Sequence, residues 1–283
     1  MSATETAAAT NGRAEHDAAG PRRFVGKRAI VTGASDRGIG GAIAERLAGE
    51  GARVRLLSRS RPEKLLKRLS FNAAEVQWSA CDVQSSREVR AAVEQCAASL
   101  EGIDVVVNNA GVEQAQRFDA VSDGEWERLI DVNLTGAVRV TRAALAHLAS
   151  PGGVIVNVAS ALALGGCPGF GAYSAAKAGL VAATQSLALE LAPRGMRAVC
   201  VAPALVHTPM THKHAARFGL AGWSELEAAQ PLGIGSPHDV AAAVAFLASY
   251  EARWITGVTL PLGWVSSYRL PTERMMDALG DEG

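Results

Sequence analysis

A serine, a tyrosine and a lysine lie in one stretch of the chain at a spacing that suits proton transfer. Residues 158–177 read VASALALGGCPGFGAYSAAK, with Tyr173 and Lys177 four residues apart at the start of a helical pattern. On a helix this spacing puts both side chains on one face, and a cation within a few ångström lowers the pKa of a phenol. Ser160, at the end of an apolar run, could hold an oxygen at the same point. The set predicts a group that protonates a carbonyl or deprotonates an alcohol; the alternative is a tyrosine packed on a lysine stem.

The composition limits what the chain binds. Its 283 residues are 48% hydrophobic, and 28 Lys and Arg balance 28 Asp and Glu. The length fits one large α/β domain, and the zero net charge argues against nucleic acid or an anionic membrane as partner. No run of 18 apolar residues is present to span a membrane. The cysteines contain no CxxC pair, which favours a reduced cytoplasmic location over disulfides or zinc; they are Cys81, Cys96, Cys167 and Cys200.

Strand-like and helical patterns alternate along the chain between two distinct ends. Residues 1–23 are rich in Ala and Thr and are predicted to form a disordered tail, residues 24–263 one domain, and residues 264–283 a C-terminal extension. Expected strands are 27–32, 53–58, 75–80, 103–109, 153–160, 197–202 and 257–261. Expected helices are 41–48, one from about 62, 86–100, 124–149, 172–193 and 237–249, and 203–235 is expected to be irregular. This alternation predicts a parallel sheet with helices on both faces.

A glycine-rich turn follows the first expected strand. In TGASDRGIGGA (32–42), Gly33, Gly38 and Gly40 lie between a strand and a helix, where backbone N–H groups can approach a pyrophosphate. A plain tight turn is the alternative. Ser58 and Arg59 end the second strand, where an NAD-binding fold would place a carboxylate. A guanidinium there favours the 2′-phosphate of NADP(H) over NAD(H). Arg37 could reach the same phosphate; Arg59 as a solvated surface charge is the alternative.

Taken together and in this order, several motifs resemble those of the classical short-chain dehydrogenase/reductases. They are TGASDRGIG, CDV at 81–83, NNAG at 108–111, Asn133 in DVNLTG, Ser160 and YSAAK, and the resemblance spans about residues 25–262. It implies an α/β fold of Rossmann type, with a doubly wound seven-stranded parallel sheet and helices on both faces. The implied activity is that of an NADP(H)-preferring ketoreductase.

The resemblance also implies roles for individual residues. Tyr173 would be the acid/base, Ser160 would orient the carbonyl, Lys177 would bond the nicotinamide ribose, and Asn133 would hold a proton-relay water. Asp82 would contact the adenine; alternatively, it caps the N-terminus of a helix. Asn109 would line the cofactor path; alternatively, it fastens neighbouring strands to each other. The expected cofactor contacts are Gly33, Ser35, Arg37, Gly38, Ile39, Gly40, Ser58, Arg59, Asp82, Val83, Asn109, Ala110, Gly111, Tyr173, Lys177, Pro203, Val206 and Thr208.

Three features depart from the family pattern. The glycine loop is one residue longer than usual, since four residues separate Gly33 from Gly38, and this leaves the role of Asp36 open. Ala204 follows Pro203 where the family has glycine. LGW stands at 262–264 in place of Asp-Gly-Gly.

Residues 205–230 are expected to form a lid over an apolar substrate. Its apolar residues are Leu205, Met210, Phe218, Leu220 and Trp223. His207, His212 and His214 fit a metal site less well than substrate contacts or surface positions, because no carboxylate or cysteine accompanies them, and no metal is expected. No Lys or Arg occurs in 145–152, which favours a free small molecule, such as a secondary metabolite, steroid or xenobiotic, over a carrier-protein thioester.

The expected function is NADPH-dependent reduction of a ketone or aldehyde to an alcohol, or the reverse. A nonredox epimerase or dehydratase of the same fold and an NADPH-binding regulator are the alternatives. The family resemblance implies a homodimer or homotetramer formed through the helices at 124–149 and 172–193, whose faces are rich in alanine.

Overall fold

The computed structural model describes residues 22–71, 75–228 and 230–263, and the side chains within 214–222 are outside this description. The expected C-terminal extension and all but the last two residues of the expected N-terminal tail therefore lie outside the described residues. Within the described part, no helix has the length and apolar character needed to cross a membrane.

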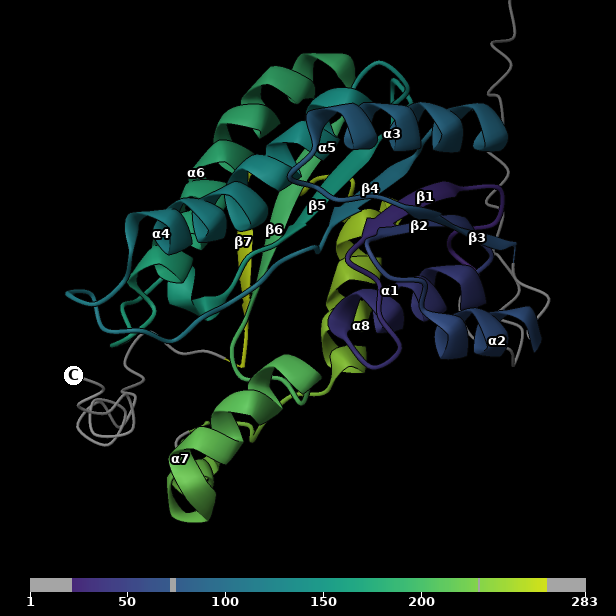
Figure 1. The fold of residues 1–283 in the computed structure, drawn as a ribbon. Helices are drawn as coiled ribbons and strands as arrows, with labels where there is room; N and C mark the ends of the chain where they lie inside the picture. Colours follow the sequence, from purple (N-terminus) through teal and green to yellow (C-terminus); the bar gives the residue numbers. More distant parts are fainter. Residues whose placement is uncertain (1–21, 72–74, 229, 264–283) are drawn as a thin grey trace, which may run out of the picture.

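Seven parallel strands form the centre of the domain, as expected from the alternating pattern (Figure 1). Their order is β3-β2-β1-β4-β5-β6-β7. The chain reverses its direction of winding between β1 and β4, so the sheet is doubly wound and its switch point lies at the carboxyl ends of these two strands. The strands are β1 (Arg28–Thr32), β2 (Arg53–Ser58), β3 (Val76–Ala80), β4 (Val105–Asn108), β5 (Val154–Val158), β6 (Arg197–Pro203) and β7 (Thr259–Leu262).

Helices cover both faces of the sheet (Figure 1). One face carries α1 (Ile39–Gly49), α2 (Glu63–Phe71) and α8 (Pro237–Ala248); the other carries α3 (Ser86–Leu100), α4 (Asp123–Ile130), α5 (Gly136–Ala144) and α6 (Gly171–Leu191). Central strands are apolar on both sides because both faces are covered: all residues of β4 and β5 are buried. Two apolar cores result, one on each face.

Two helical segments differ from the sequence expectation. The helix expected at 124–149 ends at Ala144 and contains a π-helical turn, η1 (Asp131–Thr135), between α4 and α5. The segment expected to be irregular contains α7 (Pro209–Ala228), so that expectation was wrong. Thr208 begins α7 by accepting a hydrogen bond from the Thr211 amide at 3.2 Å, with Pro209 next in the chain. Thr-Pro is a common helix start, but Gly219 and Gly222 obscure the helical pattern behind it.

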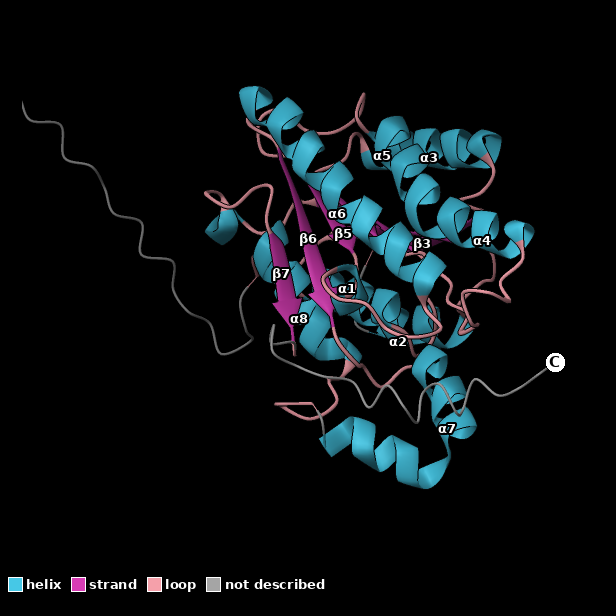
Figure 2. Cartoon of the chain, turned by 90° about the vertical axis from the view of Figure 1, so that its left-hand side faces the viewer, coloured by secondary structure: helices cyan, strands magenta, loops and turns pink. Residues whose placement is uncertain are grey.

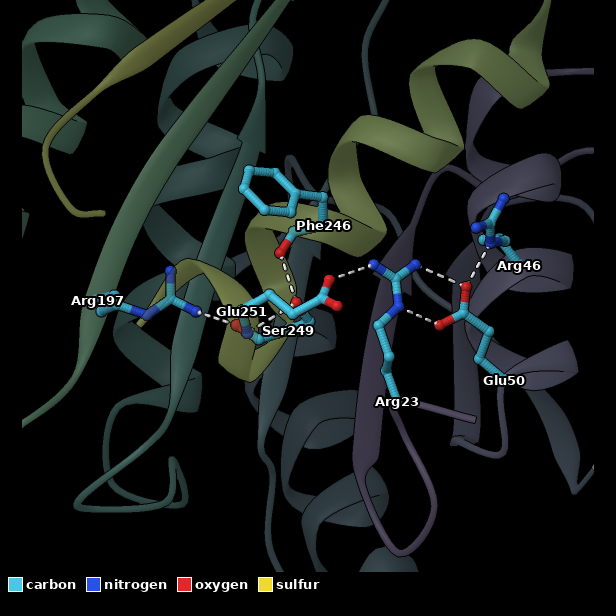
Figure 3. A network of polar contacts seen from close by, with 7 residues as sticks. All are labelled: Arg23, Arg46, Glu50, Arg197, Phe246, Ser249 and Glu251. Carbon is cyan, nitrogen blue, oxygen red and sulfur yellow. Dashed lines mark hydrogen bonds and ion pairs between the residues drawn. The ribbon is translucent and has the colours of Figure 1, made fainter. Parts of the chain in front are cut away.

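The carboxyl ends of the strands are where the functional parts meet. The arrowheads of β6 and β7 point toward α7, which extends beyond that edge of the sheet (Figure 2). The opposite region of the domain is fastened by ionic contacts: Arg23 binds Glu50 at the end of α1 and also Glu251 (Figure 3). This ionic cluster and the candidate site therefore lie apart.

Candidate active site

One large cavity, of about 610 Å³, opens along the carboxyl ends of the strands. Most of the residues expected from the sequence to bind cofactor or substrate line it, as do all four expected catalytic residues. Arg37 and Gly40 are not among its lining residues. The cavity is built from the loops that follow β1, β2, β3, β4, β5 and β6, at the switch point where doubly wound sheets bind ligands.

The glycine turn is shaped by close backbone contacts. Gly33 has a φ of +68°, and a Cβ at this position would lie 2.5 Å from the Cα of Ala110. Asn109 donates from Nδ2 to the carbonyl oxygens of Thr32 and Gly33, at 3.0 and 3.1 Å. Asn109 thus fastens β1 to β4, the alternative considered for it, while it also lines the cavity. Gly40 lies against this contact, and a Cβ there would clash with the Asn109 side chain and the Gly33 carbonyl oxygen. A glycine is therefore required at this position although it does not line the cavity.

The longer glycine loop is held by Asp36. Its carboxylate accepts a hydrogen bond of 2.9 Å from the amide of Leu65, in the first turn of α2. Its carbonyl oxygen accepts a bond of 2.9 Å from Arg68. First-turn amides of a helix lack partners within the helix, so Asp36 caps α2 from a distant part of the chain. Asp36 therefore ties the expected pyrophosphate turn to the next βα unit.

Two arginines line the cavity at the end of β2. Arg59 is exposed and lines it directly after Ser58. Arg61, two residues before the start of α2, also lines the cavity, with its guanidinium 5.6 Å from the centroid of the Trp78 ring. Trp78 donates a hydrogen bond of 2.9 Å to the Ser58 hydroxyl. The expected phosphate end of the cavity thus holds two guanidinium groups.

Asp82 does not cap α3. The N-cap of that helix is Ser85, whose hydroxyl accepts from the Glu88 amide at 3.2 Å. Asp82 instead accepts from the amide of Gln84 at 3.0 Å and lines the cavity beside Val83. The capping alternative is therefore wrong, and the carboxylate shapes the turn where the adenine contact was expected.

The three residues of the predicted acid–base set do come together. Tyr173 and Lys177 lie in α6, with the ammonium nitrogen of Lys177 5.7 Å from the centroid of the Tyr173 ring. Ser160 follows β5, and its hydroxyl is hydrogen-bonded to Tyr173. Lys177 donates a bond of 2.8 Å to the carbonyl oxygen of Val158, at the end of β5. Strand β5 and helix α6 therefore position the whole set.

Burial dominates the protonation of this set. It raises the pKa of Tyr173 above its ordinary value; the nearby Glu113 carboxylate adds to the rise, and the hydrogen bond with Ser160 opposes it. Burial also lowers the pKa of Lys177 to about 8. The expectation of a lowered pKa for Tyr173 is thus wrong, because desolvation of the buried phenol dominates. Tyr173 is held as a neutral phenol, the form that donates a proton.

Asn133 lies in the π-helical turn, and its amide binds the chain across from it. Its Oδ1 accepts from the Val112 amide at 3.2 Å, and its Nδ2 donates to the carbonyl oxygens of Val112 and Leu129 at 2.8 and 2.9 Å. The side chain is buried at 1% exposure. A π turn commonly marks a functional site; here it turns an amide toward the loop after β4.

An apolar chamber surrounds Tyr173 at the other end of the cavity from the arginines. Its members come from the loops after β4 and β5 and from the lid: Ala115, Phe170 and Leu226 are buried, with Leu162, Cys167, Tyr173, Leu205 and Trp223 packed against them. Met210 lines the cavity as well. Phe218 and Leu220, also expected here, have side chains outside the description. An apolar substrate end agrees with the sequence expectation.

The lid histidines form an aromatic stack rather than a cluster of ligands. His207 and His212 stack with ring centroids 6.0 Å apart, and Trp223 lies 6.3 Å from His212. His214 has a side chain outside the description. In the described part of the chain, no group of three or more His, Cys, Asp or Glu could hold a metal ion.

Three cavity residues were missed by sequence reasoning. Glu113 lines the cavity near Tyr173, and Arg61 and Asp36 shape its arginine end. Arg61 begins a stretch with three further basic residues, Lys64, Lys67 and Arg68, and this pattern is typical of a solvent-exposed helix face. Glu113 is the second residue after the NNAG motif, and this closeness to a motif was the one sign that could have pointed to it.

Comparison with known proteins agrees with this geometry. The profile of the family described as Enoyl-(Acyl carrier protein) reductase matches residues 33–262. The chain is 40% identical over 245 residues to 3beta-hydroxysteroid dehydrogenase 1 of Eggerthella lenta, covering 83% of this chain and 91% of that protein. It is 37% identical to a 3-oxoacyl-(acyl-carrier-protein) reductase of Vibrio cholerae, covering 83% and 95%.

A solved structure shows the same likeness. The crystal structure of a short chain dehydrogenase from Burkholderia cenocepacia in complex with NADP aligns with a TM-score of 0.76 at 34% identity, covering 85% of this chain and 97% of that one. Fold, cavity, the Ser-Tyr-Lys-Asn set and these relatives agree, and the chain belongs to the short-chain dehydrogenase/reductases, nicotinamide-dependent oxidoreductases acting on the CH–OH or C=O group.

Proposed function

We propose that this protein reduces a ketone or aldehyde to an alcohol with NADPH, with Tyr173 as the acid. One observation carries the proposal: Ser160, Tyr173 and Lys177 converge at one end of a cavity that has the glycine turn and Arg59 at its other end. Bound NADPH would supply the hydride. The close approach of Gly33 to Ala110 leaves backbone rather than side chains facing a pyrophosphate, so the residues fit a dinucleotide.

The residues of the chain have separate tasks in this reaction. Ser160 holds the carbonyl oxygen of the substrate by a hydrogen bond, and Tyr173 donates its proton to that oxygen as the alcohol forms. Lys177 binds the ribose hydroxyls with its ammonium group and favours the tyrosinate that remains, because opposite charges attract in a buried site. Asn133 keeps the loop after β4 in place through its bonds to Val112.

At the phosphate end, Arg59 and Arg61 would bind the 2′-phosphate that distinguishes NADP(H) from NAD(H). The neighbour solved in complex with NADP supports this preference. We further propose a cytoplasmic homodimer or homotetramer acting on a free small molecule. Arg37, which is exposed and outside the cavity lining, stays a predicted additional contact.

The decisive experiment replaces the acid. Tyr173→Phe removes the hydroxyl and keeps the ring, so we expect at least a hundredfold loss of kcat with NADPH binding unchanged within a few fold. The measurements are NADPH consumption at 340 nm with a panel of ketones and fluorescence titration of NADPH. A variant that keeps most of its turnover would contradict the assignment. A substrate-dependent product without net change in the cofactor would select an epimerase or dehydratase instead.

A further inference from the structure

The hydroxyl of Ser58 is engaged in contacts within the protein. It accepts a hydrogen bond of 2.9 Å from the indole nitrogen of Trp78 and donates one of 2.9 Å to the carbonyl oxygen of Ser60. A serine hydroxyl has a single proton to donate, and Ser58 gives it to Ser60. This bond closes a ring over Arg59, which stands between the two serines. Ser58 therefore shapes the turn that carries Arg59, and Trp78 holds Ser58.

The ring of Trp78 supports the second arginine of the cavity. The Arg61 guanidinium lies over the indole at 5.6 Å from its centroid, a distance at which a cation is attracted to the face of the ring. The Nε of Arg61 also lies 3.0 Å from a carboxylate oxygen of Glu63, but the two side chains of this pair are 54% and 72% exposed. Exposed ion pairs hold their partners weakly. The ring of Trp78 is therefore the firmer of the two contacts.

Trp78 is itself fixed by the sheet. It lies in β3, where it pairs with Leu56 of β2, and its side chain packs against the apolar core on the α1 and α8 face. Trp78 is not among the residues that line the cavity, whereas Arg59 and Arg61 are. One rigid side chain thus holds two mobile cationic ones from behind the cavity wall.

We propose that Trp78 is the positioning residue of the 2′-phosphate site and holds Arg59 and Arg61 in place before the cofactor binds. This inference rests on the proposed preference for NADP(H) and adds the residue that prepares the site. The indole N–H acts on Arg59 through Ser58, and the ring acts on Arg61. A free arginine side chain loses much conformational freedom when it binds a ligand, and one that is already held loses less. Trp78 therefore strengthens phosphate binding without touching the phosphate.

The test uses two nucleotides that differ in the 2′-phosphate alone, adenosine 2′,5′-bisphosphate and 5′-AMP, titrated by calorimetry. Trp78→Phe keeps a ring beneath Arg61 and loses the indole N–H, whereas Trp78→Leu loses both. The preference is the Kd of 5′-AMP divided by that of the bisphosphate. We expect it to fall about threefold in Trp78→Phe and about tenfold in Trp78→Leu. An unchanged preference in either variant would overturn the inference.

Double substitutions assign each part of the effect to its arginine. The loss caused by Trp78→Phe should disappear in a protein that already carries Arg59→Gln, because the indole N–H acts through the turn of Arg59. The additional loss in Trp78→Leu should disappear beside Arg61→Gln, because only the ring supports Arg61. Losses of the same size in both backgrounds would mean that Trp78 acts through the fold in general, and the inference would be wrong.

Two control variants separate positioning from packing and from charge. Val76→Ala removes a side chain that packs against the same core from the same face of β3. It should lower the free energy of unfolding and keep the nucleotide preference. Glu63→Gln removes the carboxylate that competes with a phosphate for Arg61 and should not lower the preference. A fall in either control as large as that in Trp78→Leu would contradict the assignment to Trp78.

These titrations need no turnover, so they test Trp78 even if the wild type reduces no ketone. If the wild type binds 5′-AMP as tightly as the bisphosphate, the proposed preference for NADP(H) is wrong, and the inference falls with it. If the wild type prefers the bisphosphate and the Trp78 variants keep that preference in full, the proposed cofactor stands and the role of Trp78 alone is refuted.

Discussion

The ammonium nitrogen of Lys177 lies 2.8 Å from the carbonyl oxygen of Val158 and donates a hydrogen bond that joins α6 to the end of β5. The side chain is 4% exposed, and burial lowers its pKa to about 8. Holding this cation in the interior disfavours folding, since the same ammonium is fully hydrated in the unfolded chain. The positive charge beside Tyr173 therefore lowers the stability of the folded protein.

Replacing this cation should stabilise the unliganded protein while it removes activity. A pKa lowered from 10.5 to about 8 means that the buried ammonium destabilises the fold by roughly 3 kcal/mol at neutral pH. Removing it also removes the hydrogen bond to Val158, which offsets about 1 kcal/mol of this gain. We expect Lys177→Met to raise the free energy of unfolding by about 2 kcal/mol at pH 7, measured by urea denaturation, with turnover lost.

The pH dependence provides the check. The folded pKa is below the unfolded one, so the cost of the ammonium is complete below about pH 8 and fades as the pH rises toward 10.5. The advantage of Lys177→Met should shrink over this range. A variant less stable than the wild type at pH 7 would mean that the bond to Val158 outweighs desolvation.

Cofactor preference should depend on the arginines that line the cavity. Arg59→Gln should lower the ratio of kcat/KM for NADPH to that for NADH by about a hundredfold, and Arg61→Gln by about tenfold, because a lost charge-assisted bond is worth roughly 1.5–3 kcal/mol. Arg37→Gln, at an exposed position outside the lining, is the matched comparison and should change the ratio least. Equal effects of all three substitutions would indicate a diffuse field rather than a phosphate site.

Much of the fold could be predicted because local patterns and tertiary context agree. The strands that became β4 and β5 are mainly valine and isoleucine, and a parallel sheet covered on both faces buries such runs completely. Tyr173 and Lys177 were placed on one face by helical spacing alone. Gly33 and Asn109 were found through the turn and the motif around them, which are local features.

The features that were missed depend on contacts between distant segments. Asp36 caps α2 across 29 positions, and no local pattern reveals such a partner. The raised pKa of Tyr173 depends on burial by Phe170, Leu205 and the lid, which spacing does not report. Asn133 was placed in an ordinary helix because a π turn of five residues leaves the periodicity on either side almost unchanged.

Glu50 should make stability depend on acid. The carboxylate is buried, which raises its pKa, but hydrogen bonds from Arg23 and Arg46 outweigh burial and hold the pKa below its ordinary value of 4.5 (Figure 3). Glu50→Gln leaves Arg23 without this partner, and we expect a loss of about 3 kcal/mol at pH 7, measured by denaturant unfolding.

The sign of the pH effect follows from the lowered pKa. The contribution of Glu50 is complete above pH 4.5 and disappears as the pH falls through the folded value, so wild type and Glu50→Gln should converge in acid. Glu251→Gln is the control: its side chain is 60% exposed in its pair with Arg23, and its loss should cost less than about 1 kcal/mol. A difference between wild type and Glu50→Gln that persists at pH 2 would show that packing, not charge, stabilises this position.

Two buried asparagines allow structural and functional roles to be separated. Asn157 is 3% exposed; it accepts a bond of 2.8 Å from Asn108 and donates one of 2.7 Å to Thr184, linking β4, β5 and α6. Asn133 is buried to a similar degree but binds Val112, in the loop that leads into the chamber. Each alanine substitution leaves buried partners unsatisfied and should cost about 2–4 kcal/mol of stability.

The two variants should differ in their activity. Asn157→Ala keeps the loop after β4 intact, so kcat/KM of the folded fraction should stay within a few fold of wild type at 15 °C. Asn133→Ala releases Val112 and with it the loop that leads into the chamber around Tyr173, so kcat should fall by at least tenfold. If both variants lose the same amount of kcat, Asn133 supports the fold in general. If Asn133 acts at the site, releasing Val112 must lower kcat more than breaking the Asn157 contacts does.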